Sequence, residues 1–251
     1  MTMNNKNQSH KYYFDRPEIW EEVNQGRFER EPKFLLDIFK KFGEVKEILD
    51  VGCGTGSHLA KLEEFGLTGV GIDLNEKMIE FAKQKYPSLK FDVRDMRELD
   101  YSNQFDAVLC LCTTFSYNTT NDEVIASLRG FSKALRKGGV IVIDLLNTMS
   151  FIQKRKFENK IETSYEKFGL RSETEHQIDE NRQILIEKRT VFSANDNKQV
   201  KSDITDFRLF FPQEFKLFLE TTGFEFLEFY GSYDIGHTTL DKSRMIVVAK
   251  K

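Results

Sequence analysis

The segment 47–56, with the sequence EILDVGCGTG, constrains the fold more than any other part of the chain. Glycines at alternate positions let the backbone turn sharply and approach a ligand where a β-carbon would clash. The helix expected at 56–65 would begin with free N–H groups directed at that ligand. A second apolar run ends at Asp73, where a carboxylate can accept two hydrogen bonds from a ribose diol, as in dinucleotide-binding folds. This order of strand, glycine bend, helix, strand and acidic end predicts a site for a nucleoside-type ligand.

Strands and helices alternate on both sides of this segment. Apolar runs predict strands at 47–51, 68–72, 89–93, 105–112 and 140–146. Helical spacing of apolar residues predicts helices at 31–42, 56–65, 75–85 and 122–136. Strands and helices that alternate in this way form a parallel, doubly wound α/β sheet. A last helix at 213–222 and strands at 225–230 and 245–249 complete a mostly parallel sheet of seven strands.

The pattern changes between 151 and 211. Polar, alternating strands are expected at 173–178, 183–192 and 201–211, with turn-like stretches between them. They predict an antiparallel β-sheet inserted into the parallel domain. The predicted organisation is an N-terminal helical or lid segment (1–43, flexible over 1–16), a cofactor-binding core (44–150), the inserted sheet on the acceptor side (151–211), and the last helix and final strands of the core (212–251).

Charge and hydropathy narrow the class of partner. The chain of 251 residues carries 37 basic and 40 acidic residues, and proteins that grip many phosphates usually show a basic excess. A nucleic-acid partner is therefore not favoured. No stretch approaches the roughly 20 apolar residues of a membrane helix, and residues 1–11 lack an apolar signal region. These features predict a cytoplasmic protein that does not bind membranes.

The cysteines Cys53, Cys110 and Cys112 lie in or beside apolar runs. They are expected to be reduced residues of the core. A metal site would need more ligands at recognisable spacing, so no metal is predicted.

Segment 47–56 resembles motif I of the class I S-adenosylmethionine-dependent methyltransferases, which have a Rossmann-like fold. The resemblance implies S-adenosyl-L-methionine as the cofactor. It also implies roles for matching positions: Asp73 would hold the ribose hydroxyls, Leu74 would lie against the adenine, Asp95 would reach the adenine amino group, Met96 would supply a backbone N–H, and Leu111 would line the slot. The implied cofactor-binding residues of motif I itself are Asp50, Gly52, Cys53, Gly54 and Gly56.

Plainer interpretations of the acidic residues stay open. Asp73 is otherwise a turn residue at the end of a strand, Asp95 the start of a turn, and Asp50 a surface carboxylate. Asp106 precedes an apolar strand and is interpreted as structural.

Three further stretches, 19–27, 95–97 and 206–211, resemble the N,N-dimethyltransferases of nucleotide-linked amino sugars and related small-molecule methyltransferases. The implied activity is methyl transfer to a small-molecule acceptor, with the amine of such a sugar as the leading acceptor. Alternatives are an O-methyltransferase for a sugar or carbohydrate precursor, a protein or nucleic-acid methyltransferase, and a non-catalytic cofactor-binding protein. A homodimer is one assembly open to such a chain.

Methyl transfer from a sulfonium is an in-line displacement in which the protein mainly aligns the nucleophile. A hydroxyl nucleophile needs a general base more than an amine does. The candidates near the methyl group are Tyr117, Tyr13 and His237. Each has a plainer interpretation. Tyr117 would form part of the aromatic wall of the pocket, Tyr13 would only pack beside Tyr12, and His237 would be a solvated histidine.

The sequence also gives expectations for two histidines, one arginine and four phenylalanines. His58 is expected to be exposed on the first helix after the glycine bend, and His176 on the polar side of a strand. Arg244 is either a partner for a substrate phosphate or an ordinary edge charge. The phenylalanines of the insertion are either core or stacking groups: Phe192, Phe207, Phe210 and Phe211.

Overall fold

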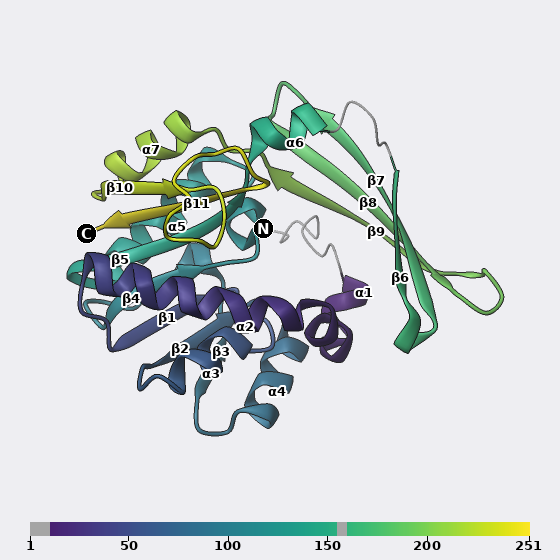
Figure 1. Cartoon of the computed structure of the whole chain (residues 1–251), viewed down its shortest axis with the longest axis horizontal. Helices are drawn as coiled ribbons and strands as arrows, with labels where there is room; N and C mark the ends of the chain where they lie inside the picture. Colours follow the sequence, from purple (N-terminus) through teal and green to yellow (C-terminus); the bar gives the residue numbers. More distant parts are fainter. Residues whose placement is uncertain (1–10, 155–159) are drawn as a thin grey trace, which may run out of the picture.

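The computed structural model describes residues 11–154 and 160–251. The stretch expected to be flexible covers residues 1–16. Residues 1–10 of it lie outside the described residues. The chain forms a large mixed sheet, helices on both of its faces, and a second sheet beside them (Figure 1).

The large sheet has seven strands in the order β10-β11-β5-β4-β1-β2-β3. The pairs that involve β1, β2, β3 and β4 are parallel, whereas β11 runs antiparallel to β5 and to β10. The doubly wound, mostly parallel sheet is thereby confirmed. Its strands are β1 (Glu47–Val51), β2 (Thr68–Asp73), β3 (Lys90–Val93), β4 (Phe105–Cys110), β5 (Leu135–Leu146), β10 (Glu225–Tyr230) and β11 (Arg244–Lys250).

Helices cover both faces because each buries an apolar stripe against the sheet. One face packs against α2 (Pro17–Phe42), α3 (Ser57–Glu63) and α4 (Glu76–Lys85). The other packs against α5 (Asn121–Ala134) and α7 (Pro212–Thr221). Asn75 caps α4 by accepting from the backbone N–H of Met78 at 3.1 Å, as its position before the helix predicts.

The inserted sheet has four antiparallel strands in the order β6-β7-β8-β9. They are β6 (Lys160–Tyr165), β7 (Leu170–Asp179), β8 (Ile184–Ser193) and β9 (Gln199–Arg208). Short helices connect the parts: α1 (Lys11–Phe14), η2 (Met96–Glu98), η3 (Thr114–Tyr117), α6 (Thr148–Lys154) and η5 (Glu166–Phe168). In Figure 1 this sheet stands to one side of the large one, with α6 leading into it.

Several expected bounds were wrong. The helix expected at 31–42 begins at Pro17, and the strand expected at 105–112 ends at Cys110. The turn expected at 137–139 lies within β5, where Gly138 has a φ of 81° and the pairing with β4 shifts register. The short helix α6 and the exposed strand β6 were not expected as elements.

Candidate active site

A cavity of about 960 Å³ lies between the carboxyl edge of the parallel strands and the inserted sheet. Its lining comes from the loops after β1 to β5, from the N-terminal segment, and from β7, β8 and β9. Its volume is near the upper end of the range of about 300–1,000 Å³ for small-molecule sites. Ligands of α/β sheets bind at this edge, so the cavity is the candidate active site.

The glycine bend forms the floor of the cavity. Gly52 and Gly54 have φ angles of 70° and 55°, in the left-handed region that favours glycine. A β-carbon on Gly52 would lie 2.2 Å from Cγ2 of Thr114, and one on Gly54 would lie 3.3 Å from Nε1 of Trp20. Both glycines line the cavity. The bend therefore offers bare backbone to a ligand, with Trp20 of α2 above it.

Asp73 stands beside the bend at the end of β2. Its Oδ2 accepts from the backbone N–H of Gly54 at 3.0 Å, and its Oδ1 accepts from that of Asn75 at 2.9 Å. Burial raises the pKa of this carboxyl, and the backbone donors act in the opposite direction. The next residue, Leu74, is 58% exposed, and both residues line the cavity. The arrangement places an oriented carboxylate next to an open apolar surface.

Asp95 and Met96 line the cavity at the end of β3. Asp95 accepts from the backbone N–H and from Nε of Arg97, at 2.9 and 2.8 Å. Burial pushes the pKa of Asp95 upward, but the hydrogen bonds from Arg97 outweigh it and the pKa is lowered. The carboxylate is therefore held charged and fixed at the mouth of the site.

Four of the residues expected to bind the cofactor do not line the cavity: Asp50, Cys53, Gly56 and Leu111. Asp50 is not the surface carboxylate of the plainer interpretation, because it is 2% exposed and burial raises its pKa to about 6. Gly56 is required by packing, since a β-carbon there would lie 2.5 Å from Phe91. Leu111 packs into the core cluster of the α2 face rather than lining the slot.

Of the three candidate catalytic residues, Tyr117 and Tyr13 line the cavity and His237 does not. Tyr117 packs against Phe207 of β9 with ring centroids 5.1 Å apart, and burial raises its pKa. Burial likewise raises the pKa of Tyr13. His237 bonds to Asp241 at 2.6 Å in the loop between β10 and β11. Its position away from the cavity does not support the role of a base.

The cavity wall contains a charged group that the sequence analysis missed. His176 of β7 shares a hydrogen bond of 3.0 Å between its Nε2 and Oε2 of Glu187, and Arg189 donates to Oε1 of Glu187 at 2.9 Å. All three line the cavity, and the His176 side chain is only 7% exposed. His176 lies among polar side chains, as its expected place on the polar side of the strand implies, but it faces the cavity rather than open solvent. The pairing of β7 with β8 sets 176 opposite 187, two positions from the register that strands ending at 178 and beginning at 183 would give.

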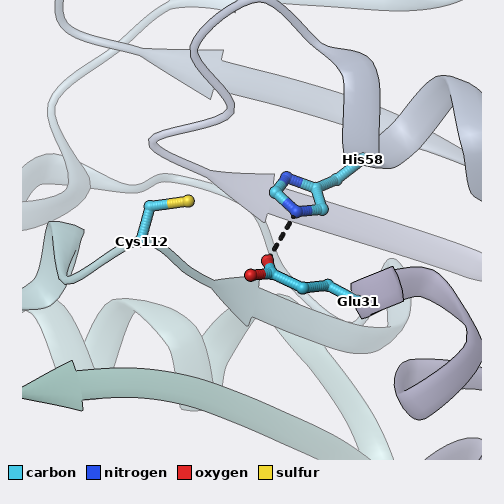
Figure 2. A group of neighbouring side chains, drawn as sticks. All are labelled: Glu31, His58 and Cys112. Carbon is cyan, nitrogen blue, oxygen red and sulfur yellow. Dashed lines mark hydrogen bonds and ion pairs between the residues drawn. The ribbon is translucent and has the colours of Figure 1, made fainter. Parts of the chain in front are cut away.

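A second group of side chains consists of Glu31 and His58, which are buried, and Cys112, which is half-buried and lines the cavity (Figure 2). Oε2 of Glu31 lies 2.8 Å from Nε2 of His58, which is 4% exposed rather than solvated as expected. One ligand atom from each of the three lies within 4.8 Å of the others. Nε of Arg27 donates to Glu31 at 2.7 Å, and burial raises the pKa of the Cys112 thiol to about 12. The guanidinium of Arg27 already supplies to Glu31 the positive charge that a metal ion would bring. The Cys112 thiol, whose pKa is raised, would have to lose its proton before it could bind a metal.

Within 11–154 and 160–251, no helix combines the length and the apolar composition that crossing a membrane requires.

Comparison with known proteins finds a family model for the core. Residues 48–139 match the family model described as a methyltransferase domain. This part of the chain is therefore similar to methyltransferase domains. It contains the glycine bend, Asp73, Asp95 and Tyr117.

Similar curated proteins include sugar methyltransferases. A dTDP-4-amino-2,3,4,6-tetradeoxy-D-glucose N,N-dimethyltransferase of Saccharopolyspora spinosa is 35% identical over 101 residues, which are 40% of this chain and 41% of that one. A dTDP-3-amino-3,4,6-trideoxy-alpha-D-glucopyranose N,N-dimethyltransferase of Streptomyces venezuelae is 30% identical over 138 residues, 53% of this chain and 58% of that one. The chain spans about half the length of these relatives. The resemblance to this group is confirmed for the methyltransferase domain.

Solved structures share the whole fold. A S-adenosylmethionine-dependent methyltransferase from Clostridium acetobutylicum superposes with a TM-score of 0.80 at 16% identity, over 95% of this chain and 98% of that one. A sugar N-methyltransferase from a Streptoalloteichus species superposes with a TM-score of 0.78 at 20% identity, over 100% of this chain and 96% of that one. The inserted sheet is therefore part of a fold that these two methyltransferase structures share.

Proposed function

We propose that this chain is an S-adenosyl-L-methionine-dependent methyltransferase that moves a methyl group to a small-molecule acceptor. The leading acceptor is the amine of a nucleotide-linked amino sugar. The observation that carries the proposal is the single cavity that joins the glycine bend and Asp73 to the wall of the inserted sheet. A cavity with these two ends has room for a nucleoside cofactor and an acceptor side by side.

The residues at the core end suit the cofactor. Each carboxylate oxygen has about two lone-pair sites, so Asp73 can accept from two ribose hydroxyls while it keeps its backbone donors. Leu74 gives the adenine an apolar surface, and Asp95 and Met96 lie at its rim. The bare backbone of Gly52 and Gly54 suits the amino-acid end. When bound, the cofactor supplies a methyl group activated by a sulfonium.

The residues at the acceptor end suit an amine. The carboxylate of Glu187 attracts a cationic ammonium group at the wall that carries Tyr117 and Phe207. An ammonium must lose a proton before its nitrogen can attack. His176 can take that proton, and Glu187 stabilises the resulting imidazolium through their 3.0 Å contact. The nitrogen lone pair then forms the new C–N bond as the C–S bond breaks in line.

The names of the relatives support the amino-sugar class, since they describe N,N-dimethyltransferases of dTDP-linked amino sugars. O-methylation of a sugar or carbohydrate precursor is the alternative, because His176 would serve a hydroxyl equally as a base. We place the acceptor side in residues 151–211 and the cofactor side in 44–150. Cytoplasmic location and a homodimer stay predictions from the sequence.

The test is a turnover assay. The purified protein is incubated with S-adenosylmethionine and either dTDP-linked amino sugars or their hydroxy counterparts, and release of S-adenosylhomocysteine is measured. Release with the amino sugars alone supports the proposal, and release with the hydroxy sugars alone supports the alternative. Absence of release with every acceptor, together with absence of cofactor binding, would refute both.

A further inference from the structure

The turn after β4 has an uncommon backbone. Cys112 and Thr113 are consecutive, and their φ angles are 55° and 64°. Residues other than glycine rarely adopt this left-handed region, and for a β-branched residue such as Thr113 it is a true outlier. Such conformations persist only where the surroundings restrain them. The structure must therefore contain a restraint on this turn.

Asp144 of β5 contacts both residues of the turn. The side-chain Oδ2 of Asp144 accepts from the backbone N–H of Cys112 at 3.1 Å. The backbone carbonyl oxygen of Asp144 accepts from the backbone N–H of Thr113, also at 3.1 Å. Nη1 of Arg244 donates to Oγ1 of Thr113 at 2.8 Å and lies 3.4 Å from Oδ2 of Asp144. The carboxylate of Asp144 thus holds the Cys112 peptide, its backbone holds the Thr113 peptide, and its partner Arg244 holds the Thr113 side chain.

Asp144 is itself held firmly. It is fully buried, and a buried carboxylate is costly unless it is paired. Nη2 of Arg27 donates to its Oδ2 at 3.1 Å from α2, and Arg244 approaches from β11. Arg27 also donates a hydrogen bond to Glu31, and Glu31 is hydrogen-bonded to His58 (Figure 2). The carboxylate therefore ties the turn to a helix and to an adjacent strand.

The turn determines where Thr114 lies. The Thr114 methyl group occupies the space beside Gly52, where a β-carbon on Gly52 would lie 2.2 Å away. Thr113, Thr114 and Tyr117 all line the cavity. A turn that relaxed to an ordinary backbone would move Thr114 away from the glycine bend and would change the floor of the cofactor end.

We propose that Asp144 is a positioning residue, which holds the Cys112–Thr113 turn left-handed and so seats Thr114 against the glycine bend. It acts through the turn and need not touch a ligand. The inference rests on the proposed function, because its consequence is a cavity shaped for the cofactor.

The test is a mutant cycle read by calorimetric titration with S-adenosylhomocysteine. Asp144→Asn keeps the size of the side chain but removes its charge, and it is expected to weaken binding at least tenfold. In a Cys112→Gly/Thr113→Gly background, the same change is expected to weaken binding less than threefold, because glycine adopts the left-handed region without the restraint. A merely structural role of Asp144 would not be rescued in this way.

The matched control is an Asn103→Gly/Gln183→Gly background, since these residues are also left-handed, with φ angles of 50° and 53°, and do not line the cavity. It should leave the tenfold loss unchanged. If thermal melting shows that Asp144→Asn does not fold, Arg244→Gln takes its place, with a smaller loss and the same rescue by glycine at 112 and 113.

An Asp144→Asn variant that binds like the wild type, or a loss that glycine at 112 and 113 does not reduce, would overturn the inference alone. A wild-type protein that does not bind S-adenosylhomocysteine would instead overturn the proposed function, and the inference with it.

Discussion

His176 and Glu187 are the residues whose chemistry depends most on their being together. A histidine alone on a strand would be an ordinary polar group, but a buried carboxylate 3.0 Å from Nε2 orients the ring of His176. We expect His176→Gln to lower kcat by about 10²–10⁴-fold, the range typical of general-base catalysis.

The measurement is the steady-state kcat and KM of turnover with the acceptor that the assay identifies. The variant should lose kcat while its KM for the acceptor changes little, because glutamine removes the proton acceptor but keeps a polar side chain in the wall. His237→Gln is the matched control, because His237 lies outside the cavity. Equal effects of the two substitutions would contradict the role of His176.

The buried carboxyl of Asp50 leads to a prediction about how the free energy of unfolding depends on pH. Burial raises its pKa to about 6 from 3.8, because the folded protein favours the neutral carboxyl. Its stabilising contribution is therefore full below about pH 4 and is lost as the pH rises through about 6. Asp50→Asn should remove this dependence, so that the variant gains up to about 3 kcal/mol over the wild type between pH 4 and pH 7.5.

Urea unfolding at the two pH values measures the difference. Asp106→Asn serves as the control of opposite sign, because hydrogen bonds from Arg136 and from the backbone outweigh burial and lower the pKa of Asp106. That variant should lose stability relative to the wild type as the pH rises. A pH dependence of Asp50→Asn that matches the wild type would show that Asp50 is not the group responsible.

At the scale of elements, the bend between β1 and α3 depends on glycine for two reasons that can be separated. Gly56 and Gly66 have similar left-handed φ angles, 76° and 80°, but a β-carbon on Gly56 would lie 2.5 Å from Phe91, and one on Gly66 would meet nothing within 4 Å. Gly66→Ala should cost about 1–2 kcal/mol of unfolding free energy from the backbone alone. Gly56→Ala should cost at least about 1 kcal/mol more, from overpacking.

Chemical denaturation of the two variants checks this prediction. Equal losses would mean that Phe91 moves aside at no cost, and that packing does not require glycine at 56.

The sequence was sufficient for elements with a local apolar pattern. The strands at 47–51 and 225–230 have the expected bounds, because each is an apolar run with clear ends. The first half of α2 was missed because its residues are mostly polar, and Ile19 is buried only against other parts of the chain. Strand β6 was missed because it is exposed and is stabilised by pairing with β7.

Part of the candidate site was also predictable from the sequence. The glycine bend, Asp73 and Asp95 follow from a local motif and do meet at one cavity. The burial of His58 and His176 was not predictable from alternation alone, because the groups that cover each histidine come from other helices or strands. The partner of His58 is Glu31, 27 positions earlier, and that of His176 is Glu187 on the next strand.

At the scale of the whole molecule, function depends on how the two sheets meet. In the proposed function, the parallel sheet supplies the cofactor end of the cavity and the inserted sheet supplies the acceptor end. Neither has both sets of groups. The sequence predicted that the inserted sheet lies on the acceptor side. It did not predict that His176, Glu187 and Arg189 form the wall there, because no local pattern gives the relation between the sheets.

The central claim is that the glycine bend and Asp73 hold a sulfonium nucleoside. Calorimetric titration of the wild type and of Asp73→Ala with S-adenosylmethionine tests it most directly. We predict binding by the wild type and at least tenfold weaker binding by the variant, since a charge-assisted hydrogen bond contributes roughly 1.5–3 kcal/mol. No wild-type binding at millimolar concentration, or equal affinity of the two proteins, would contradict the claim.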